Sequence, residues 1–368
     1  MIELKGKYAD AKIFTDMVDA ASMSQVQNLL NQQFVDGSKV RLMPDIHAGA
    51  GCTIGTTMTI TDKVCPNLVG VDIGCGMLVV PLEEQEINLE KLDAVIREHI
   101  PSGFSRHEEG KRLLSVLYEF RCREHIDWET AEKSVGTLGG GNHFIEVDKD
   151  DDGNLYLVIH SGSRHLGLEV ANCYQARAVE QCRYFGRAVP KELAYLTDEA
   201  FEDYIYDMRL AQLYANYNRI AIAQEILHHA QLQDKSPAWF ETVHNYIDTE
   251  NMVLRKGAVS AQEGERLIIP MNMRDGSLIC VGKGNPDWNY SAPHGAGRLW
   301  SRSKAKEAFT VEEFEKSMEG VFTTSVGQAT LDECPMAYKP METILDNIGD
   351  TVTVEKIIRP IYNFKAGN

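Results

Sequence analysis

Hydrophobic residues recur along the chain in two patterns. Short runs rich in Val, Ile, Leu and Thr end in turn residues, which is typical of strands. These runs are KVRLMP, TTMTITD, GMLVVPL, NLYLVIH, RLIIP, SLICVG and TVTVEKIIRPIY. Between them, INLEKLDAVIREHI places apolar residues at helical spacing behind a capping residue, Asn88. The region 198–233 predicts one or two long amphipathic helices.

This mixture of strands and helices predicts an α+β (mixed α/β) fold with mixed β-sheets and surrounding helices. No low-complexity tract, internal repeat or Pro/Gly-rich linker marks a boundary along the chain. We therefore expect residues 1–368 to form a single catalytic domain.

The amino-acid composition limits the classes of protein to which the chain can belong. The hydrophobic fraction of 43% and the charged fraction of 25% are ordinary for a globular protein. No apolar run approaches the ~20 residues that span a bilayer, and the charged N-terminus is not a signal peptide. The eight cysteines form no C-x-x-C pair. These features predict a cytoplasmic protein with reduced thiols and no membrane association.

The net charge of −17, from 54 acidic and 37 basic residues, argues against a general nucleic-acid binder. It still permits a local cationic groove on an acidic body, because a ligand responds to the local field.

Glycine-rich loops are the strongest chemical signal. The loops are HAGAGCTIG (47–55), VGVDIGCGM (69–77), GTLGGGNHF (136–144), HSGSRHLG (160–167) and HGAGR (294–298). Glycine lets a backbone approach a ligand closely, and each of these loops also contains or adjoins a histidine, cysteine or aspartate. Tight turns alone do not account for five such loops.

Five residues in or near these loops are candidate metal ligands: Asp72, Cys75, His143, His160 and His244. Together they are too many for one tetrahedral zinc, whereas a bridging thiolate would divide them into two open sites. Mixed O, N and S donors favour Mn, Fe, Co or Zn over Mg or Ca. Any one of them alone is equally well explained as a hydrogen-bonded buried histidine or an apolar cysteine.

Nine motifs occur in the order seen in the RtcB family of RNA ligases, between about Leu42 and Lys365. They are MPDIHAG, VGVDIGCGM, GGGNHFIEV, HSGSRHLG, VHNY, RKGAVSA, PHGAGR, SRSKAK and PMAYK. The chain therefore resembles that family. The resemblance implies a GTP- and Mn²⁺-dependent ligase that joins an RNA 3′-phosphate or 2′,3′-cyclic phosphate to a 5′-hydroxyl.

The resemblance also implies individual roles. His294 is expected to attack the α-phosphate of GTP and to carry a covalent GMP. One Mn²⁺ is expected on Asp72, Cys75 and His143, and a second on Cys75, His160 and His244. Asp45 matches an acidic position near the active centre, while Arg164 and Arg302 are expected to bind RNA phosphates. The expected nucleotide contacts are Asn142, Glu146, Asn245, Asn272, Ser277, Gly295, Ala296, Gly297, Tyr338 and Lys365.

The chain departs from the family pattern at several positions. HAGAG replaces HLGKG, so that Ala50 stands where a basic residue is usual, and IPMNMRDG (269–276) replaces IPGSMG. These changes indicate a divergent, short branch with its own RNA substrate, such as tRNA halves or nicked rRNA, and with room for an activating protein partner.

Two other classes of function remain open. A binuclear metal-dependent phosphoesterase would use the same ligands to activate water without a covalent nucleotide. A catalytically silent RNA-binding protein is the third possibility, although the joint presence of all five ligands and His294 disfavours it.

Overall fold

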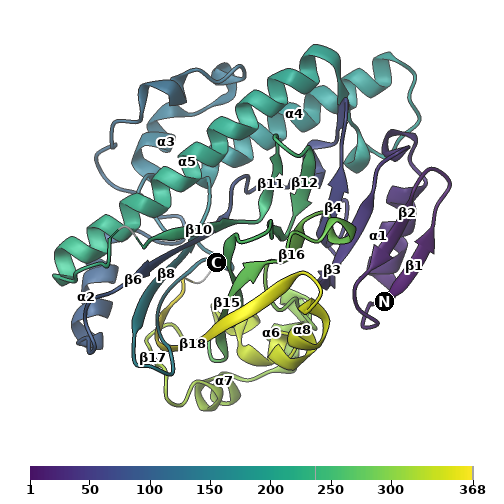
Figure 1. Ribbon diagram of the computed structural model, residues 1–368. Coiled ribbons are helices and arrows are strands. Elements are labelled where there is room, and N and C mark those ends of the chain that lie inside the picture. Colours follow the sequence, from purple (N-terminus) through teal and green to yellow (C-terminus); the bar gives the residue numbers. More distant parts are fainter. Residues whose placement is uncertain (237, 367–368) are drawn as a thin grey trace.

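The computed structural model describes residues 1–236 and 238–366, whose strands gather mainly into two large sheets (Figure 1). Within these residues, the first sheet holds six strands. In spatial order they are β1 (Ile2–Lys5), β2 (Asp10–Ile13), β3 (Val40–His47), β4 (Ile54–Thr59), β12 (Val253–Lys256) and β11 (Asn245–Asp248). β2 and β3 pair in parallel, and the other neighbours pair antiparallel.

The second sheet holds eight strands in the described residues, and all but one of its pairings are antiparallel. In order they are β10 (Phe240–Val243), β6 (Gly76–Pro81), β8 (Leu155–Ser161), β7 (Phe144–Lys149), β18 (Val352–Phe364), β15 (Gly276–Gly282) and β14 (Arg266–Asn272), with β17 (Phe322–Thr323) parallel to β18. Both sheets are therefore mixed, and each of the seven apolar runs forms a strand as expected.

The remaining strands form small pairs, β13 (Ala258–Ser260) with β16 (Ser291–Pro293) and β5 (Lys63–Val64) with β9 (Leu196–Thr197). The helices are α1 (Ala20–Leu30), α2 (Leu89–His99), α3 (Trp128–Ser134), α4 (Arg164–Tyr184), α5 (Asp198–Ala230), α6 (Arg302–Ala308), α7 (Val311–Ser317) and α8 (Met341–Ile348). Within the described part of the chain, no helix combines the length and apolar composition that crossing a membrane requires.

The two long helices, α4 and α5, run side by side across one side of the molecule (Figure 1). The amphipathic region after residue 197 is thus one uninterrupted helix. The expected cap of α2 is also present, because the Asn88 side chain accepts a hydrogen bond from the Lys91 N–H.

Two central strands of the eight-stranded sheet, β6 and β8, are buried along their whole length, which explains their continuous apolar runs. In β6, Leu78 and Val80 pack in the layer that contains α2 and α5. Met77 and Val79 point the other way and pack in the layer of β14, β15 and β18. Since successive side chains of a strand alternate between faces, a run such as GMLVVP fits only a strand covered on both sides.

The two large sheets meet where the chain passes from β10 to β11. His244 is the single residue between these strands, and each strand belongs to a different sheet. Its N–H donates to the Cys75 carbonyl (2.9 Å), and its carbonyl accepts from the Gly257 N–H (2.7 Å). The glycine-rich loops around positions 75 and 257 are therefore tied to this junction.

Helix α5 supports the junction with two fully buried polar residues. Asn218 accepts from the Gly136 N–H (2.8 Å) and donates to the Gly162 carbonyl (3.2 Å). Arg219 donates to the Gly74 carbonyl (2.8 Å) and is paired with Glu241. These bonds satisfy the backbone groups of three glycine-rich loops that no strand pairs.

Replacing Arg219 by Met should lower the free energy of unfolding by about 3 kcal/mol. The substitution removes the donor to Oε1 of Glu241 and to two buried carbonyls, and removing one partner of a buried ion pair is costly. Equilibrium unfolding in urea measures the change. Arg209→Met is the matched control, because Arg209 is exposed on the same helix and should change stability by less than about 0.5 kcal/mol. Equal losses in the two variants would contradict the supporting role of Arg219.

Candidate active site

The candidate metal ligands come together at the junction of the sheets. Cys75 and His143 directly precede β6 and β7, and His160 lies in β8. These three and His244 are each only 3–4% exposed. Four segments separated by up to 169 positions thus place their donor atoms in one buried volume, as the glycine-rich loops led us to expect.

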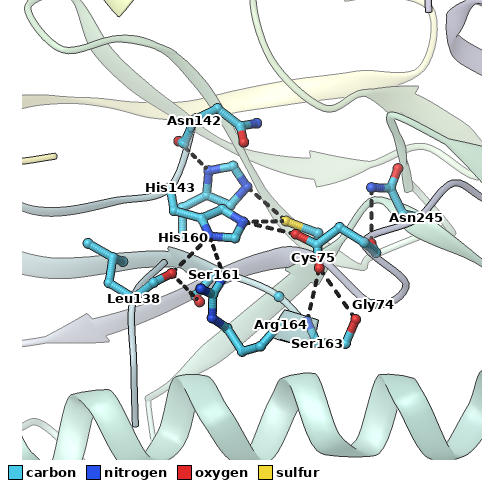
Figure 2. A network of polar contacts seen from close by, with 12 residues as sticks. Gly74, Cys75, Leu138, Asn142, His143, His160, Ser161, Ser163, Arg164 and Asn245 are labelled. Carbon is cyan, nitrogen blue, oxygen red and sulfur yellow. Dashed lines mark hydrogen bonds and ion pairs between the residues drawn. The ribbon is translucent and has the colours of Figure 1, made fainter. Parts of the chain in front are cut away.

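Cys75 lies at the centre of the closest group (Figure 2). Its Sγ is 3.4 Å from Nε2 of His143 and 3.3 Å from Nε2 of His160. A thiolate and an imidazole bound tetrahedrally to one ion, at Zn-like bond lengths, would have their donor atoms about 3.6 Å apart. The three donor atoms therefore already have nearly the spacing that a bound metal ion requires.

The backbone fixes the ring orientation of two histidines. Nδ1 of His143 donates to the Leu138 carbonyl (2.8 Å), and Nδ1 of His160 donates to the Asn142 carbonyl (3.1 Å; Figure 2). A proton held on Nδ1 leaves the lone pair on Nε2, which is the atom that faces Cys75. Both rings are therefore oriented and protonated as metal ligands.

Asp72 joins this group through His143, since its Oδ2 lies 3.0 Å from Nε2 of that ring. Burial alone would raise the pKa of Asp72. The adjacent His143 ring, the charge of Arg164 and the N–H of Ser163 outweigh burial and hold that pKa well below its usual range. Asp72 is thus an ionised oxygen donor beside the two nitrogen ligands.

His244, the fifth candidate ligand, lies near both His160 and His294. Its ring centre is 5.1 Å from that of His160 and 4.9 Å from that of His294. Burial, with the neighbouring histidines, holds the pKa of His244 well below its usual value, so the ring is neutral. Its buried Nδ1 has no hydrogen-bond partner among the described residues. An unsatisfied imidazole nitrogen at such a place fits a metal ligand.

The Cys75 thiol fits the same interpretation. Burial and then the charge of Asp72 raise its pKa well above the usual value. A coordinating thiol loses its proton to the metal's field, so a cation at this position would compensate the unfavourable burial of a thiolate. The donor set of one thiolate, three imidazoles and one carboxylate therefore fits a borderline transition metal.

His294 lies next to this cluster, directly after β16. Its Nδ1 is 2.6 Å from Oδ2 of Asp45, and the same oxygen accepts from its backbone N–H (3.2 Å). Asp45 is fully buried in β3, so the imidazole has a fixed partner on one side. This pairing holds the proton on Nδ1 and leaves Nε2 with its lone pair.

The backbone around this pair leaves room only for glycine. Gly297 has φ +75°, and a Cβ there would lie 2.4 Å from the Asp45 carbonyl oxygen. The loop thus packs directly over β3. Lys339 secures the other side, because its buried Nζ donates to the carbonyls of Pro44 (3.0 Å) and Ile46 (3.2 Å), the neighbours of Asp45.

A cavity of ≈ 770 Å³ opens beside His294, which is a size typical of sites for nucleotides and similar ligands. Its lining includes most of the expected contacts: Asn142, Glu146, His160, Asn272, His294, Gly295, Ala296, Gly297, Arg302, Tyr338 and Lys365. The metal cluster reaches the cavity through His160.

Glu333 forms hydrogen bonds and ion pairs with the other polar groups of one wall of this cavity. It accepts hydrogen bonds from Nζ of Lys365 (2.6 Å) and from the Tyr338 hydroxyl (2.5 Å). Two guanidinium groups, of Arg298 (3.1 Å) and Arg302 (2.9 Å), also pair with it. Burial would raise the pKa of Glu333, but these cations lower it to about 2. The wall is thus a charged network that holds its shape before any ligand binds.

A second carboxyl group, Glu146, faces the cavity from β7 and accepts a hydrogen bond from Asn363 (2.6 Å). Burial raises its pKa to about 7, against the opposing effects of Asn363 and Lys365. Asp148 lies two residues further along the same face of the strand. It is fully buried, and neither of its side-chain oxygens has a partner among the described residues. Burial and then the charge of Glu146 raise the pKa of Asp148 well above its usual value, so it is a neutral acid.

Some residues expected to bind the nucleotide lie outside the cavity lining or form hydrogen bonds with other parts of the protein. Ser277 is fully buried in β15 and is absent from the lining that the described residues form, and Asn245 bridges the Asp72 carbonyl and the Gly257 N–H. The Asn272 side chain caps its own turn by accepting from the N–H groups of Arg274 and Asp275. Their direct nucleotide contacts remain predictions.

The two arginines expected to bind RNA phosphate differ in their surroundings. Arg164 packs inward with its guanidinium against Gly139, and its Nη1 is 3.4 Å from Nδ1 of His143. Arg302 is at the cavity opening with 44% of its side chain exposed, paired with Asp332 (2.7 Å). Of these two arginines, Arg302 lines the cavity and Arg164 does not.

Five supporting residues were not among those expected from the sequence. Two of them, Asn218 and Arg219, are polar positions on the buried face of a long helix, which was a detectable signal. The other three adjoin motifs that were recognised for different residues: Arg298, Glu333 and Lys339. Their roles depend on contacts between distant segments, which a single sequence does not display.

The fold and site define an α+β protein with a buried thiol–imidazole centre beside a nucleotide-sized cavity. The chain belongs to the RtcB family, because the family model described as "tRNA-splicing ligase RtcB" matches residues 25–129 and 118–366. "RNA-splicing ligase RtcB" of Escherichia coli (strain K12) is 31% identical over 389 residues, covering 95% of each chain. "tRNA-splicing ligase RtcB" of Aeropyrum pernix is 28% identical over 96% of this chain and 93% of that protein. The family expected from the motifs is thus confirmed, and with it membership in a family of RNA ligases.

Replacing Cys75 by Ala should abolish binding of Mn²⁺ to the cluster, because a methyl group cannot coordinate and Sγ lies between the two imidazole nitrogens. Metal content after dialysis against Mn²⁺, measured by mass spectrometry, tests this. Cys280→Ala, which removes a buried thiol from β15, should retain the wild-type metal content. Two ions retained by the Cys75 variant would exclude a shared thiolate ligand.

Replacing Asp148 by Asn should make the free energy of unfolding less dependent on pH. An acid whose pKa is raised by folding contributes stability that is complete below its unfolded pKa, about 4, and is lost as pH rises toward the folded pKa. Relative to the variant, the wild type should therefore lose stability as the pH rises from 5 to 7, by at most about 1.4 kcal/mol for each pH unit. Urea unfolding at these two pH values measures the difference. Parallel pH profiles would show that Asp148 is ionised in the folded protein.

Proposed function

We propose that this protein joins an RNA end bearing a 3′-phosphate, or a 2′,3′-cyclic phosphate that water has first opened, to a 5′-hydroxyl end. GTP supplies the energy through a covalent bond between His294 and GMP. The observation that carries the proposal is the 2.6 Å contact between Nδ1 of His294 and the buried carboxylate of Asp45, at the edge of the cavity.

The nucleophile in this proposal is Nε2 of His294. Asp45 holds the proton on Nδ1 and stabilises the positive charge that develops when Nε2 attacks, as the carboxylate does in a Ser-His-Asp triad. The Nε2–Pα bond forms and the bond from Pα to the bridging oxygen breaks, releasing pyrophosphate. Gly295 and Gly297 leave space at the ring for the phosphorus centre.

Joining then takes two displacements. A 3′-phosphate oxygen attacks Pα of the histidine–GMP and releases neutral His294, which gives an RNA 3′-end activated by GMP. The 5′-hydroxyl oxygen attacks the RNA phosphorus, and GMP leaves. The hydroxyl proton must be removed as the new bond forms. His294 lines the cavity and was released neutral in the preceding step, so its Nε2 can accept that proton.

Two Mn²⁺ ions would be held by Asp72, Cys75 and His143 and by Cys75, His160 and His244. When bound, they would neutralise charge on the reacting phosphates. The buried donor atoms, with the rings already oriented by the Leu138 and Asn142 carbonyls, support this assignment.

Guanine would bind at the inner end of the cavity, near Glu146, Lys365 and Tyr338. An ionised carboxylate accepts hydrogen bonds from guanine N1–H and its amino group, a pattern that adenine cannot match. Because the pKa of Glu146 is about 7, its ionised form predominates only above neutral pH or when a ligand stabilises it. Lys365 supplies a nearby positive charge that favours ionisation.

The biological substrate would be a cleaved tRNA or rRNA, since the relatives are RNA-splicing and tRNA-splicing ligases by name. The free thiols of the described cysteines are compatible with a reducing cytoplasmic setting, and an activating protein partner remains part of the proposal. We also propose that the whole chain acts as one catalytic domain, because the site draws residues from both large sheets.

A metal-dependent phosphoesterase is the second candidate, since it would use the same donor cluster. It gives no role to the buried Asp45 beneath His294. Incubation with α-³²P-labelled GTP separates the two functions, because only the ligase retains label after denaturation.

His294→Ala should eliminate the labelled adduct, and Asp45→Asn should slow its formation on the order of 10³-fold or more by changing the tautomer of His294. His228→Ala is the control, because that histidine is exposed on α5 and should not affect labelling. The wild-type adduct should be acid-labile and base-stable, as expected of a phosphoramidate. RNA sealing by His294→Ala at the wild-type rate would refute the covalent intermediate.

A further inference from the structure

Two large apolar side chains are exposed at the opening of the cavity. Leu299 is 49% and Trp300 39% exposed, and both line the same cavity as His294. Most large apolar side chains of the described residues are buried, so an exposed indole at the entrance of a reaction cavity requires an explanation. We call residues 298–306 the rim segment.

The backbone and neighbours of Trp300 hold it in place. The N–H groups of Leu299 (2.9 Å) and Trp300 (3.4 Å) donate to the Ala337 carbonyl. The Trp300 carbonyl accepts from Nε of Arg298 (3.0 Å). The Phe309 ring meets the indole edge-on, with centres 5.9 Å apart and planes at 79°. The exposed indole is therefore fixed before a ligand arrives.

The rim segment is also a basic stretch on an acidic protein. Its sequence, RLWSRSKAK, has four cations and no carboxylate, against a net charge of −17 for the chain. Three of the cations pair with Asp332 or Glu333, whereas Lys304 lines the cavity and is in no ion pair within residues 1–236 and 238–366. A cationic rim around an exposed aromatic ring matches an anionic ligand that carries a flat base.

The two ends of the cavity suit different ligands. The inner end is walled by Glu146, Glu333 and Lys365, which are only 2–6% exposed and hydrogen-bonded. Such groups can form hydrogen bonds with the edge of a base. The rim offers the exposed apolar surface of Leu299 and Trp300 and the positive charge of Lys304, and such a surface accepts any base by stacking.

We propose that Trp300, with Leu299 beside it, is a stacking platform for the terminal unpaired base of the RNA strand whose 3′-phosphate reaches His294. This inference rests on the proposed function, because it assigns the outer part of the same cavity to the RNA end. The base lies against the indole, Lys304 and Arg302 face the phosphates that follow, and the 3′-phosphate extends inward toward His294.

Stacking of this kind predicts little preference for base identity at the joined 3′-end. Every base has a π-face, and no hydrogen-bonding group of the platform distinguishes one base from another. The site would accept ends that differ in sequence, provided that the last base is unpaired.

The test is a double-mutant cycle between protein and RNA. The binding of a short 3′-phosphorylated RNA to the metal-loaded full chain is measured by fluorescence anisotropy, with the terminal nucleotide either intact or replaced by a stable abasic ribose. Trp300→Ala should weaken binding of the intact RNA about tenfold or more and should hardly change binding of the abasic RNA. Trp300→Phe should restore most of the loss, because phenylalanine retains an aromatic face.

Phe104→Ala is the matched control, since Phe104 is an aromatic residue with 94% exposure outside the cavity lining. It should bind both RNAs like the wild type. Equal losses with intact and abasic RNA in Trp300→Ala would overturn the platform. A raised KM for GTP in adduct formation, with RNA binding unchanged, would assign the indole to GTP and would also overturn it.

The proposed function can fail separately from the platform. Absence of a labelled adduct on the wild type would refute the histidine–GMP mechanism, yet the binding cycle would still report on Trp300. A wild type that forms the adduct and seals RNA, combined with additive losses in the cycle, would refute the platform alone.

Discussion

The rest of the structure depends on the buried ligand cluster at the junction of the two sheets. When the sheets meet, a thiol, three imidazoles and a carboxylate lose most of their water, and each polar atom needs a partner. Backbone carbonyls at Leu138 and Asn142 take the Nδ1 protons of two rings, which leaves the donor atoms facing Cys75. Donor atoms arranged in this way suit a bound cation.

The glycine-rich loops that carry these residues are held in place by hydrogen bonds from residues outside the loops. Asn218 and Arg219 of α5 satisfy the backbone groups of loops that have no strand partners, and both are fully buried. Lys339 performs the same task for the carbonyls on either side of Asp45. His294 and the ligand cluster thus owe their positions to polar residues that lie outside the cluster.

The cavity shows a gradient from a polar, buried inner end to a basic, partly apolar rim. Glu333 is buried and binds four cationic or hydroxyl groups, two of which come from the rim segment, whereas Trp300 and Leu299 are exposed at the opening. Such a gradient suits a reaction with two ligands. One would be recognised by hydrogen bonds to the edge of its base, and the other would be bound by stacking and by its charge. It also reconciles the acidic composition of the chain with an RNA substrate, because the positive charge is local.

The sequence by itself determined the strands, the long helix after residue 197 and the glycine-rich loops, and it singled out the residues that the fold gathers around Cys75. Apolar periodicity reports on burial, and the order of the motifs indicated the family. Only the tertiary structure decided that Glu333 joins Lys365 and Tyr338, that Asn272 is engaged by its own turn, and that Ser277 lies away from the cavity. These outcomes depend on contacts between segments far apart in the chain, and side-chain pairing across such distances leaves no periodic trace in one sequence.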